Sequence, residues 1–195
     1  MIHPHTRLQH ISDAVGYGIF ATEDIPEGTI VYAKDILEIA VSPADYLKHG
    51  EAMRDVVDKY SYIDEQGYRI VSWDLAKYVN HSCDRNTIST GYGFEMAIRD
   101  IAAGEQLTDE YGIFNLDVSM QCYCGADNCR KRIGPGDFDR YYPEWDVKIR
   151  RSIPKLYTVN QPLYGLLSPQ VRRELDTLRQ DPERYKSVYA LKLRD

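Results

Sequence analysis

The sequence has no long apolar run, and nowhere does it approach the roughly 20 consecutive apolar residues that a membrane-spanning helix needs. Its start, MIHPHTRLQH, also lacks the apolar core of a secretory signal. We therefore expect a soluble, intracellular protein with no membrane partner. Its location would be cytoplasmic if the source is microbial and nuclear if it is eukaryotic.

The chain also lacks an excess of basic residues, because 24 Lys and Arg stand against 30 Asp and Glu and give a net charge of -6. Residues 1–134 hold 12 basic against 21 acidic residues, whereas residues 135–195 hold 12 against 9. A negative field favours cationic partners and argues against direct binding to a phosphate backbone. We expect a basic, lysine-containing protein or peptide as partner and no direct nucleic-acid binding, although the charge can equally serve solubility alone. The oligomeric state stays open.

Cysteine is scarce, and three of the four cysteines lie in one short segment, Cys122-x-Cys124-x4-Cys129. In an intracellular chain such clustering favours metal binding over disulfides. Tetrahedral zinc needs four ligands, and Cys83 is the one cysteine outside the segment. A set of four thiolates leaves no open position for water, so we expect one structural zinc per chain. The alternative is four ordinary reduced thiols.

With 195 residues, of which 43% are apolar, the chain fits one globular domain with a short appendage. Its first third predicts short strands over 18–22 and 29–32, joined by a turn at 24–28. The phrase Ala-x-x-Asp-Ile-x-x-Gly occurs at 21–28 and again at 97–104, which predicts two similar hairpin turns.

Helical patterns occur in the middle and near the end of the chain. Ser42-Pro43 and the apolar spacing that follows predict one helix over about 43–60, weakened by Gly50. Gly134-Pro135-Gly136 breaks the chain, Ser168-Pro169 starts a helix, and Asp181-Pro182 starts another short one. The apolar stripes of this tail are too narrow for an independent core, so we expect it to pack on the main domain.

The segment Asn80-His81-Ser82-Cys83 resembles the signature of SET-domain lysine methyltransferases. Three other segments follow in the order of that family, covering together residues 16 to about 133: Gly16-Tyr17-Gly18, Gly104-Glu105-Gln106-Leu107-Thr108-Asp109-Glu110-Tyr111, and Cys122-x-Cys124-Gly125-x-x-x-Cys129. The family also uses the cysteine of its Asn-His-Ser-Cys motif as a zinc ligand. The resemblance therefore implies the metal set Cys83, Cys122, Cys124 and Cys129.

The resemblance implies a fold as well. It is a mainly β (α+β) SET-domain fold of small antiparallel sheets, with a pseudo-knot where the Asn80 strand meets the Tyr111 segment. The expected divisions are a SET domain over 1–116 with its helical insert at about 43–60, a post-SET zinc-binding segment over 117–134, and a helical C-terminal extension over 135–195.

The function implied is transfer of a methyl group from S-adenosylmethionine to the side-chain amine of a protein lysine, in a histone or another basic protein. The cofactor-binding residues carried over from the family are Gly16, Tyr17, Gly18, Tyr62, Asn80, His81 and Tyr111. Glycine lets the backbone approach a ligand closely, and an amide offers both a donor and an acceptor. Isolated, each of these residues is read equally well as a turn glycine, a buried polar pair or a strand tyrosine.

Tyr111 is the expected catalytic residue. A lysine amine has a reference pKa of about 10.4 and is mostly an ammonium ion at neutral pH, so transfer requires deprotonation and alignment. A tyrosine hydroxyl at the mouth of a dry, narrow channel can align the amine with the methyl group. The alternative for Tyr111 alone is a packed strand aromatic.

Several positions depart from the family pattern. Glu110 stands in place of an aspartate, Arg85 in place of a proline and Asp74 in place of an asparagine. Asp109 stands where members carry a Phe or Tyr that helps set the number of methyl groups, and residues 32–37 lack the usual Glu-Tyr-x-Gly. Arg85 and Asp74 favour a divergent branch of the family, for which a microbial source is one candidate.

Two alternative functions follow from those departures. One is a SET-like zinc module that binds a lysine-containing peptide or a partner without catalysis. The other is methylation of a small amine or another protein nucleophile.

Overall fold

The computed structural model describes residues 1–194. Its strands are β1(Thr6–Ser12), β2(Gly16–Ala21), β3(Ile30–Ala33), β4(Ile39–Val41), β5(Ser61–Ile63), β6(Arg69–Val71), β7(Asn80–His81), β8(Thr87–Ser89), β9(Phe94–Ala97), β10(Gln106–Asp109), β11(Met120–Gln121) and β12(Arg132–Ile133). Its α-helices are α1(Pro43–Tyr46), α2(Glu51–Tyr60), α3(Asp137–Leu156) and α4(Pro169–Gln180). Short 3-10 turns complete it at η1(Leu75–Tyr78), η2(Tyr111–Ile113), η3(Tyr164–Leu166), η4(Pro182–Arg184) and η5(Val188–Leu191). None of the described helices combines the length and apolar character that crossing a membrane demands.

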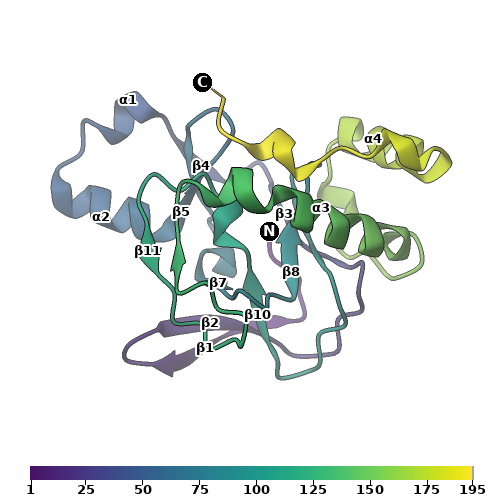
Figure 1. Ribbon diagram of the computed structural model, residues 1–195, viewed down its shortest axis with the longest axis horizontal. Coiled ribbons are helices and arrows are strands. Elements are labelled where there is room, and N and C mark those ends of the chain that lie inside the picture. Colours follow the sequence, from purple (N-terminus) through teal and green to yellow (C-terminus); the bar gives the residue numbers. More distant parts are fainter. Residues whose placement is uncertain (195) are drawn as a thin grey trace.

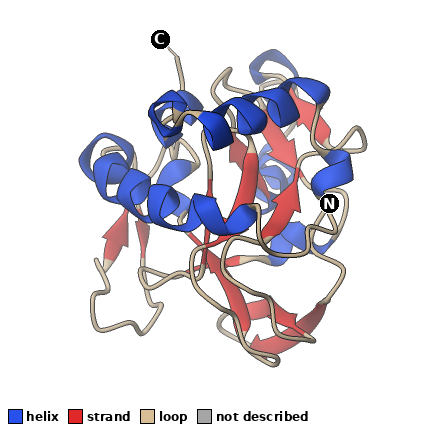
Figure 2. Ribbon diagram, turned by 90° about the vertical axis from the view of Figure 1, so that its right-hand side faces the viewer, coloured by secondary structure: helices blue, strands red, loops and turns tan. Residues whose placement is uncertain are grey.

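The strands form small sheets, in the orders β1-β2-β10-β7, β3-β9-β8, β4-β6-β5 and β11-β12. Every pairing is antiparallel except that of β7 with β10. Figure 1 shows α1 and α2 at one side of these sheets and α3 and α4 at the other. In the view turned by 90° the helices lie mostly above the strands (Figure 2). The predicted fold class, small antiparallel sheets with added helices, is confirmed.

The parallel pairing of β7 with β10 brings together the two segments expected to meet at a pseudo-knot. Thr108 lies opposite Asn80, and Asp109 lies opposite His81. Ser82 then donates its backbone N-H to the Asp109 carbonyl oxygen at 3.2 Å. Residues about 28 positions apart along the chain thus stand side by side directly before Tyr111.

The two repeated turns are present and pair with each other. Ile25 and Ile101 exchange backbone hydrogen bonds of 2.8 and 2.9 Å. The Asp24 carboxylate accepts from the backbone N-H of Ala103, and the Asp100 carboxylate accepts from that of Glu27, each at 2.8 Å. The repeat is therefore a local, nearly two-fold contact that closes one end of the sheets.

The insert at 43–60 differs from the single predicted helix, because it consists of α1 and α2 separated by residues 47–50. Ser42 caps α1 through a hydrogen bond to the Asp45 N-H, as its sequence suggests. Gly50 is extended and precedes α2 as its N-cap. The low helix propensity of glycine explains why the helix ends and restarts there.

The tail contains the longest helix, α3, to which the sequence analysis assigned no bounds. Pro143 and Pro154 lie inside it, and proline normally interrupts a helix because it lacks an N-H donor. Burial of one face stabilises α3 nonetheless, through Phe138, Trp145 and Ile149 among others. The helix α4 begins after Ser168 as predicted, and Leu175 and Leu178 are buried on it.

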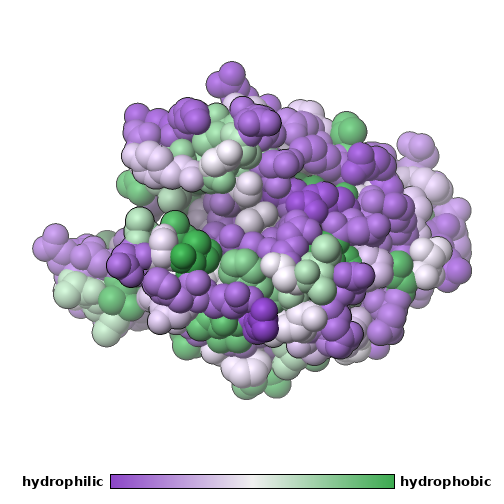
Figure 3. Space-filling model, turned by 90° about the horizontal axis from the view of Figure 1, so that it is seen from below, coloured by the Kyte–Doolittle hydropathy of each residue, from purple (hydrophilic) through white to green (hydrophobic). Residues whose placement is uncertain are grey.

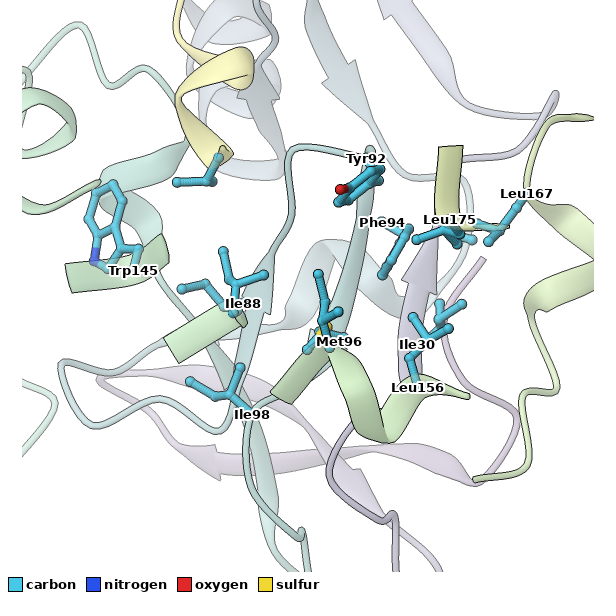
Figure 4. Close-up of a cluster of buried hydrophobic side chains, with 14 of the residues drawn as sticks. Ile30, Ile88, Tyr92, Phe94, Met96, Ile98, Trp145, Leu156, Leu167 and Leu175 are labelled. Carbon is cyan, nitrogen blue, oxygen red and sulfur yellow. The ribbon is translucent and has the colours of Figure 1, made fainter. Parts of the chain in front are cut away.

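The main core lies between the β3-β9-β8 sheet and the tail helices (Figure 4). Ile30, Ile88 and Met96 from the strands are fully buried, and they belong to one cluster with Trp145 and Leu175 of the tail. At the close contact with η5, a side chain on Gly91 would place its Cβ 2.3 Å from the carbonyl oxygen of Ser187. The boundaries at 116, 134 and 135 stay predictions, but the tail helices share this core with the strands.

Candidate functional site

The glycine segment and the Asn80 strand lie against each other. The Asn80 side-chain amide donates to the Tyr17 carbonyl oxygen at 2.9 Å. A Cβ on Gly18 would lie 2.5 Å from Nε2 of Gln106 and 3.0 Å from Nδ2 of Asn80, so a larger residue there would have to displace the ends of these side chains. Gly16 has a φ of +82°, in the left-handed region that favours glycine. The local structure thus favours glycine at both positions, and the glycine segment contacts the Asn80 strand.

His81 lies between the cysteine cluster and Tyr111. Its Nδ1 is 3.1 Å from the Asp109 carbonyl oxygen and 3.2 Å from the Tyr111 backbone nitrogen, and its Nε2 is 3.4 Å from the Cys83 sulfur. Burial lowers the pKa of His81 to about 4, although the nearby Glu110 carboxylate opposes that shift. The imidazole is therefore neutral at physiological pH, and it connects the segment 81–83 to the segment 109–111.

Tyr111 and Tyr62 line a cavity of about 560 Å³. The ring of Phe114 lies 5.3 Å from that of Tyr62 and 5.6 Å from that of Tyr111, measured between centroids. Tyr111 donates its hydroxyl to the Val79 carbonyl oxygen at 2.7 Å. Sequence reasoning missed Phe114, because a phenylalanine three residues after Tyr111 matches no motif.

Not all of the predicted cofactor residues line this cavity. Gly16, Tyr17, Gly18, Asn80 and His81 are absent from its described walls, although Asn80 directly follows Val79, which does line it. The structure thus forms two linked groups, one around Asn80 and one around Tyr111. They join at the β7-β10 pairing.

A second cavity of about 270 Å³ adjoins the first. Both cavities share one set of wall residues: Tyr32, Tyr62, Ile63, Glu95 and Phe114. Two molecules that enter from the two cavities can therefore approach each other at a common aromatic wall.

The hydroxyls of Tyr111 and Tyr62 in the large cavity stay protonated. Burial raises the pKa of Tyr111, and the carboxyl groups of Asp109 and Glu95 raise it further. Burial likewise raises the pKa of Tyr62, with Glu95 adding to the effect. Tyr111 can therefore orient a ligand through its hydroxyl, but it is not available as a phenolate base.

The four cysteines come together as predicted, with their sulfur atoms all within 4.8 Å of one another. Four sulfurs at about 2.3 Å from a tetrahedral zinc would be about 3.8 Å apart, and those of Cys83 and Cys122 are 3.9 Å apart. Backbone N-H groups of Cys83 and Arg130 point to the sulfurs of Cys124 and Cys83 at 3.4 and 3.3 Å. The donor set fits one structural zinc ion held by Cys83, Cys122, Cys124 and Cys129.

Two residues that depart from the family pattern, Arg85 and Glu110, bind each other. Arg85 and Glu110 form a buried ion pair of 3.0 Å, with side chains 4% and 0% exposed. Arg130, from the zinc segment, binds the other carboxylate oxygen of Glu110 and also reaches Asp137 of α3 at 3.3 Å. The residue before Tyr111 thus connects the motif strand, the zinc segment and the tail. Asp74, a third departure, caps η1 and accepts the Ile2 N-H at 2.7 Å.

Exposed hydrophobic side chains flank the large cavity. They lie on or near two segments that contribute to its walls, the α1-α2 insert and the stretch after η2: Leu47, Met53, Val56, Val118 and Met120. Figure 3 shows a face that is mainly hydrophilic, with hydrophobic side chains gathered in its left and central parts.

Comparison with known proteins agrees with these motifs. Residues 16–112 match the family model described as SET domain. The chain is 28% identical over 137 residues to a putative histone-lysine N-methyltransferase, ASHH4, of Arabidopsis thaliana, which covers 63% of this chain and 38% of the relative. It is 32% identical over 136 residues to an H3 lysine-36 specific histone-lysine N-methyltransferase of Debaryomyces hansenii, which covers 61% of this chain and 18% of the relative.

Among solved structures, KRYPTONITE in complex with mCHG DNA and SAH is similar, with a TM-score of 0.46 and 26% identity. The match covers 65% of this chain and 29% of that one. The chain spans less than two fifths of the length of each of these relatives.

Proposed function

Because this chain belongs to the SET-domain family, we propose that it is an S-adenosylmethionine-dependent methyltransferase whose acceptor is the side-chain amine of a protein lysine. The observation that carries the proposal is the convergence of Tyr111, Tyr62 and Phe114 on one cavity beside the Asn80-His81 strand. The relatives named as histone-lysine N-methyltransferases support a basic protein such as a histone as the substrate.

The large cavity has the size and chemistry for the methyl donor. Ligand pockets in proteins span about 300–1,000 Å³ and combine apolar walls with a few polar groups. Here six aromatic side chains line the walls together with apolar and charged ones, and two buried polar atoms in them, Oγ of Ser61 and Oδ2 of Asp109, have no hydrogen-bond partner. Tyr62 and Tyr111 would hold the donor there, with Gly16, Tyr17, Gly18, Asn80 and His81 at the adjoining edge.

When bound, the donor supplies a sulfonium methyl group, whose carbon bonds to the acceptor nitrogen while the electron pair of its bond to sulfur returns to sulfur. The chain's own residues position and dehydrate the acceptor. Tyr111 keeps its hydroxyl protonated and anchored on the Val79 carbonyl oxygen, so its direction is defined. Tyr32 and Phe114, which line both cavities, keep water from the junction.

The zinc ion would have a structural role. Its four sulfur ligands join the segment after β11 to the loop after β7, and Arg130 continues that link to Glu110. Metal binding would therefore hold the segment before Tyr111 in place, and with no open position it would not activate water.

The test is incubation with labelled S-adenosylmethionine and a panel of core histones, basic nucleoid proteins and lysate, followed by mass spectrometry of the products. Methylated lysine is the expected result. Tyr111→Phe should bind S-adenosylmethionine within a few-fold of wild type while transfer falls on the order of 10²-fold, because only the positioning hydroxyl is lost.

Tyr164→Phe, a matched change in the tail at η3, is the control and should keep wild-type transfer. Wild-type turnover by Tyr111→Phe would remove Tyr111 from catalysis. Cofactor binding by calorimetry without transfer to any acceptor would favour a non-catalytic binding module.

A further inference from the structure

Two carboxyl groups meet in the wall of the large cavity. Asp109 ends β10 and is 1% exposed, and Glu95 lies on the neighbouring part of β9. Oδ1 of Asp109 accepts the Glu110 backbone N-H at 2.7 Å, whereas Oδ2 has no hydrogen-bond partner. Glu95 also lines the smaller cavity, so the pair stands where the two cavities adjoin.

The two groups behave as one acid. Burial raises the pKa of Glu95 well above its usual value, and the Asp109 carboxylate raises it further. Burial also raises the pKa of Asp109, to about 6, against the lowering effect of the Glu110 backbone N-H. Two neighbouring carboxyl groups in a buried wall disfavour a second negative charge, so the pair favours one proton and a single negative charge.

The surroundings leave that charge without a counter-ion. The titratable and charged groups facing the pair are Glu110 and Arg85 next to Asp109, Glu38 and the Met1 amino group near Glu95, and the hydroxyls of Tyr62 and Tyr111. Arg85 is bound to Glu110 at 3.0 Å. Within residues 1–194, no lysine or arginine forms an ion pair with Glu95 or Asp109. A buried, unpaired negative charge in a cavity wall favours a cationic ligand.

We propose that the Glu95–Asp109 carboxyl pair takes the proton that the acceptor ammonium must lose and thereby selects a cationic amine as the acceptor. The inference rests on the proposed methyl transfer and deepens it. In the step, an N-H bond of the ammonium breaks, an O-H bond forms on the carboxyl pair, and the electron pair of the N-H bond stays on nitrogen as the lone pair that attacks the methyl carbon.

The charges explain why the step suits this site. The ammonium loses its +1 charge while the pair loses its -1 charge, so two buried charges disappear together. In water an amine with a reference pKa of about 10.4 would hold its proton against an acid of pKa about 6. Burial lowers the pKa of an amine by up to about 3–5 units, which closes that gap in the dehydrated cavity. The hydroxyl of Tyr111, protonated throughout, cannot serve as this base.

The first test compares kcat/KM with core histones and labelled S-adenosylmethionine from pH 6.5 to 9.5. Wild type should be nearly flat from pH 7 to 9, because the pair already carries its charge and the acceptor arrives as an ammonium ion. Asp109→Asn should lose on the order of 10²-fold at pH 7 and recover about tenfold per pH unit, because the solution must then deprotonate the amine.

Two further variants refine the comparison. Glu95→Gln retains a donor to the Asp109 carboxylate and the single negative charge, so it should lose only a few-fold. Asp176→Asn, the same chemical change on the exposed face of α4, should follow wild type. An Asp109→Asn profile parallel to wild type, with equal rates, would overturn the proposal.

The second test needs no turnover. Carbon-13 NMR of the carboxyl groups should show a titration near pH 6 that disappears in Asp109→Asn. At pH 7, n-butylammonium, a probe for the end of a lysine side chain, should bind wild type at least tenfold more tightly than Asp109→Asn. Equal binding, or carboxyl titrations that all lie below pH 5, would refute the pair as a proton acceptor. If no histone is methylated while the carboxyl titration and the preference for n-butylammonium both hold, the proposed substrate fails and the cation-selective pair stands.

Discussion

The buried contact between Glu110 and Arg85 supports the sharpest prediction for stability. Glu110 is fully buried and receives two guanidinium groups, those of Arg85 and Arg130, together with the Gly112 N-H at 2.9 Å. Glu110→Gln removes the carboxylate that both guanidinium groups share and leaves Arg130 with Asp137 at 3.3 Å and Arg85 with Glu144 at 3.9 Å. Breaking a buried ion pair in this way costs about 3–5 kcal/mol. For a chain of this size the melting temperature should fall by about 10 °C.

The partner substitution should cost less. Arg85→Met leaves Glu110 with Arg130 and the Gly112 N-H, so we expect a loss of about 1–3 kcal/mol in the free energy of unfolding. The double variant, Glu110→Gln with Arg85→Met, lacks both the Glu110 carboxylate and the Arg85 guanidinium group. Its cost should therefore fall short of the sum of the single costs by about 1–2 kcal/mol.

The assay is urea unfolding of the four proteins at saturating zinc, followed by circular dichroism. Asp45→Asn is the matched control, because it breaks an exposed pair with Lys48 of 2.7 Å and should leave the unfolding midpoint close to that of wild type. If the costs of the two single variants add up to the cost of the double variant within about 0.5 kcal/mol, Arg85 and Glu110 are not coupled. The explanation of these two departures from the family pattern would then be wrong.

Three other predictions follow from the site and the tail. Metal analysis should find about one zinc per chain. Cys124→Ser should lose the metal and unfold more readily, because structural zinc supplies on the order of 10 kcal/mol of apparent folding free energy. A metal-free, fully active protein would exclude the assignment. His81→Ala should weaken S-adenosylhomocysteine binding in calorimetry at unchanged zinc content, and unchanged affinity would remove His81 from the cofactor site. Although burial alone would raise the pKa of Glu27, hydrogen bonds from Lys155 and Ser152 hold that pKa below its usual value. The stability from this contact is therefore present above the unfolded pKa of about 4.3 and is lost as pH falls through the lower folded value. Glu27→Gln should make the free energy of unfolding less dependent on pH in the acid range, and an unchanged dependence would contradict this.

Local patterns were sufficient for several features. The caps at Ser42 and Ser168 begin helices as expected, because a serine followed by proline satisfies the first free N-H groups within four residues. The insert was predicted as one helix and is two, since propensity alone does not show whether a glycine interrupts or ends a helix. α3 was missed for a related reason: its two prolines oppose helix formation locally, and the burial that outweighs them comes from distant strands.

For the site, the sequence by itself determined the motif segments and the four cysteines, because these rest on residue type and short spacing. The choice of Tyr111 came from the family resemblance that those segments carry. The roles of Gly16, Tyr17, Gly18, Tyr62, Asn80, His81 and Tyr111 stay predictions that the proposed experiments test. Tertiary structure decided which of these residues meet, because contact across the β7-β10 pairing depends on register and not on spacing along the chain.

The tertiary structure also determines which contacts the residues that depart from the family pattern make. Arg85 and Glu110 are 25 residues apart, and each alone reads as an exposed surface charge until the fold buries them together. Glu95 gives no signal in the sequence, since an acid on a short strand usually faces water. Only the fold places it in the same cavity wall as Asp109, where burial raises the pKa of both carboxyl groups.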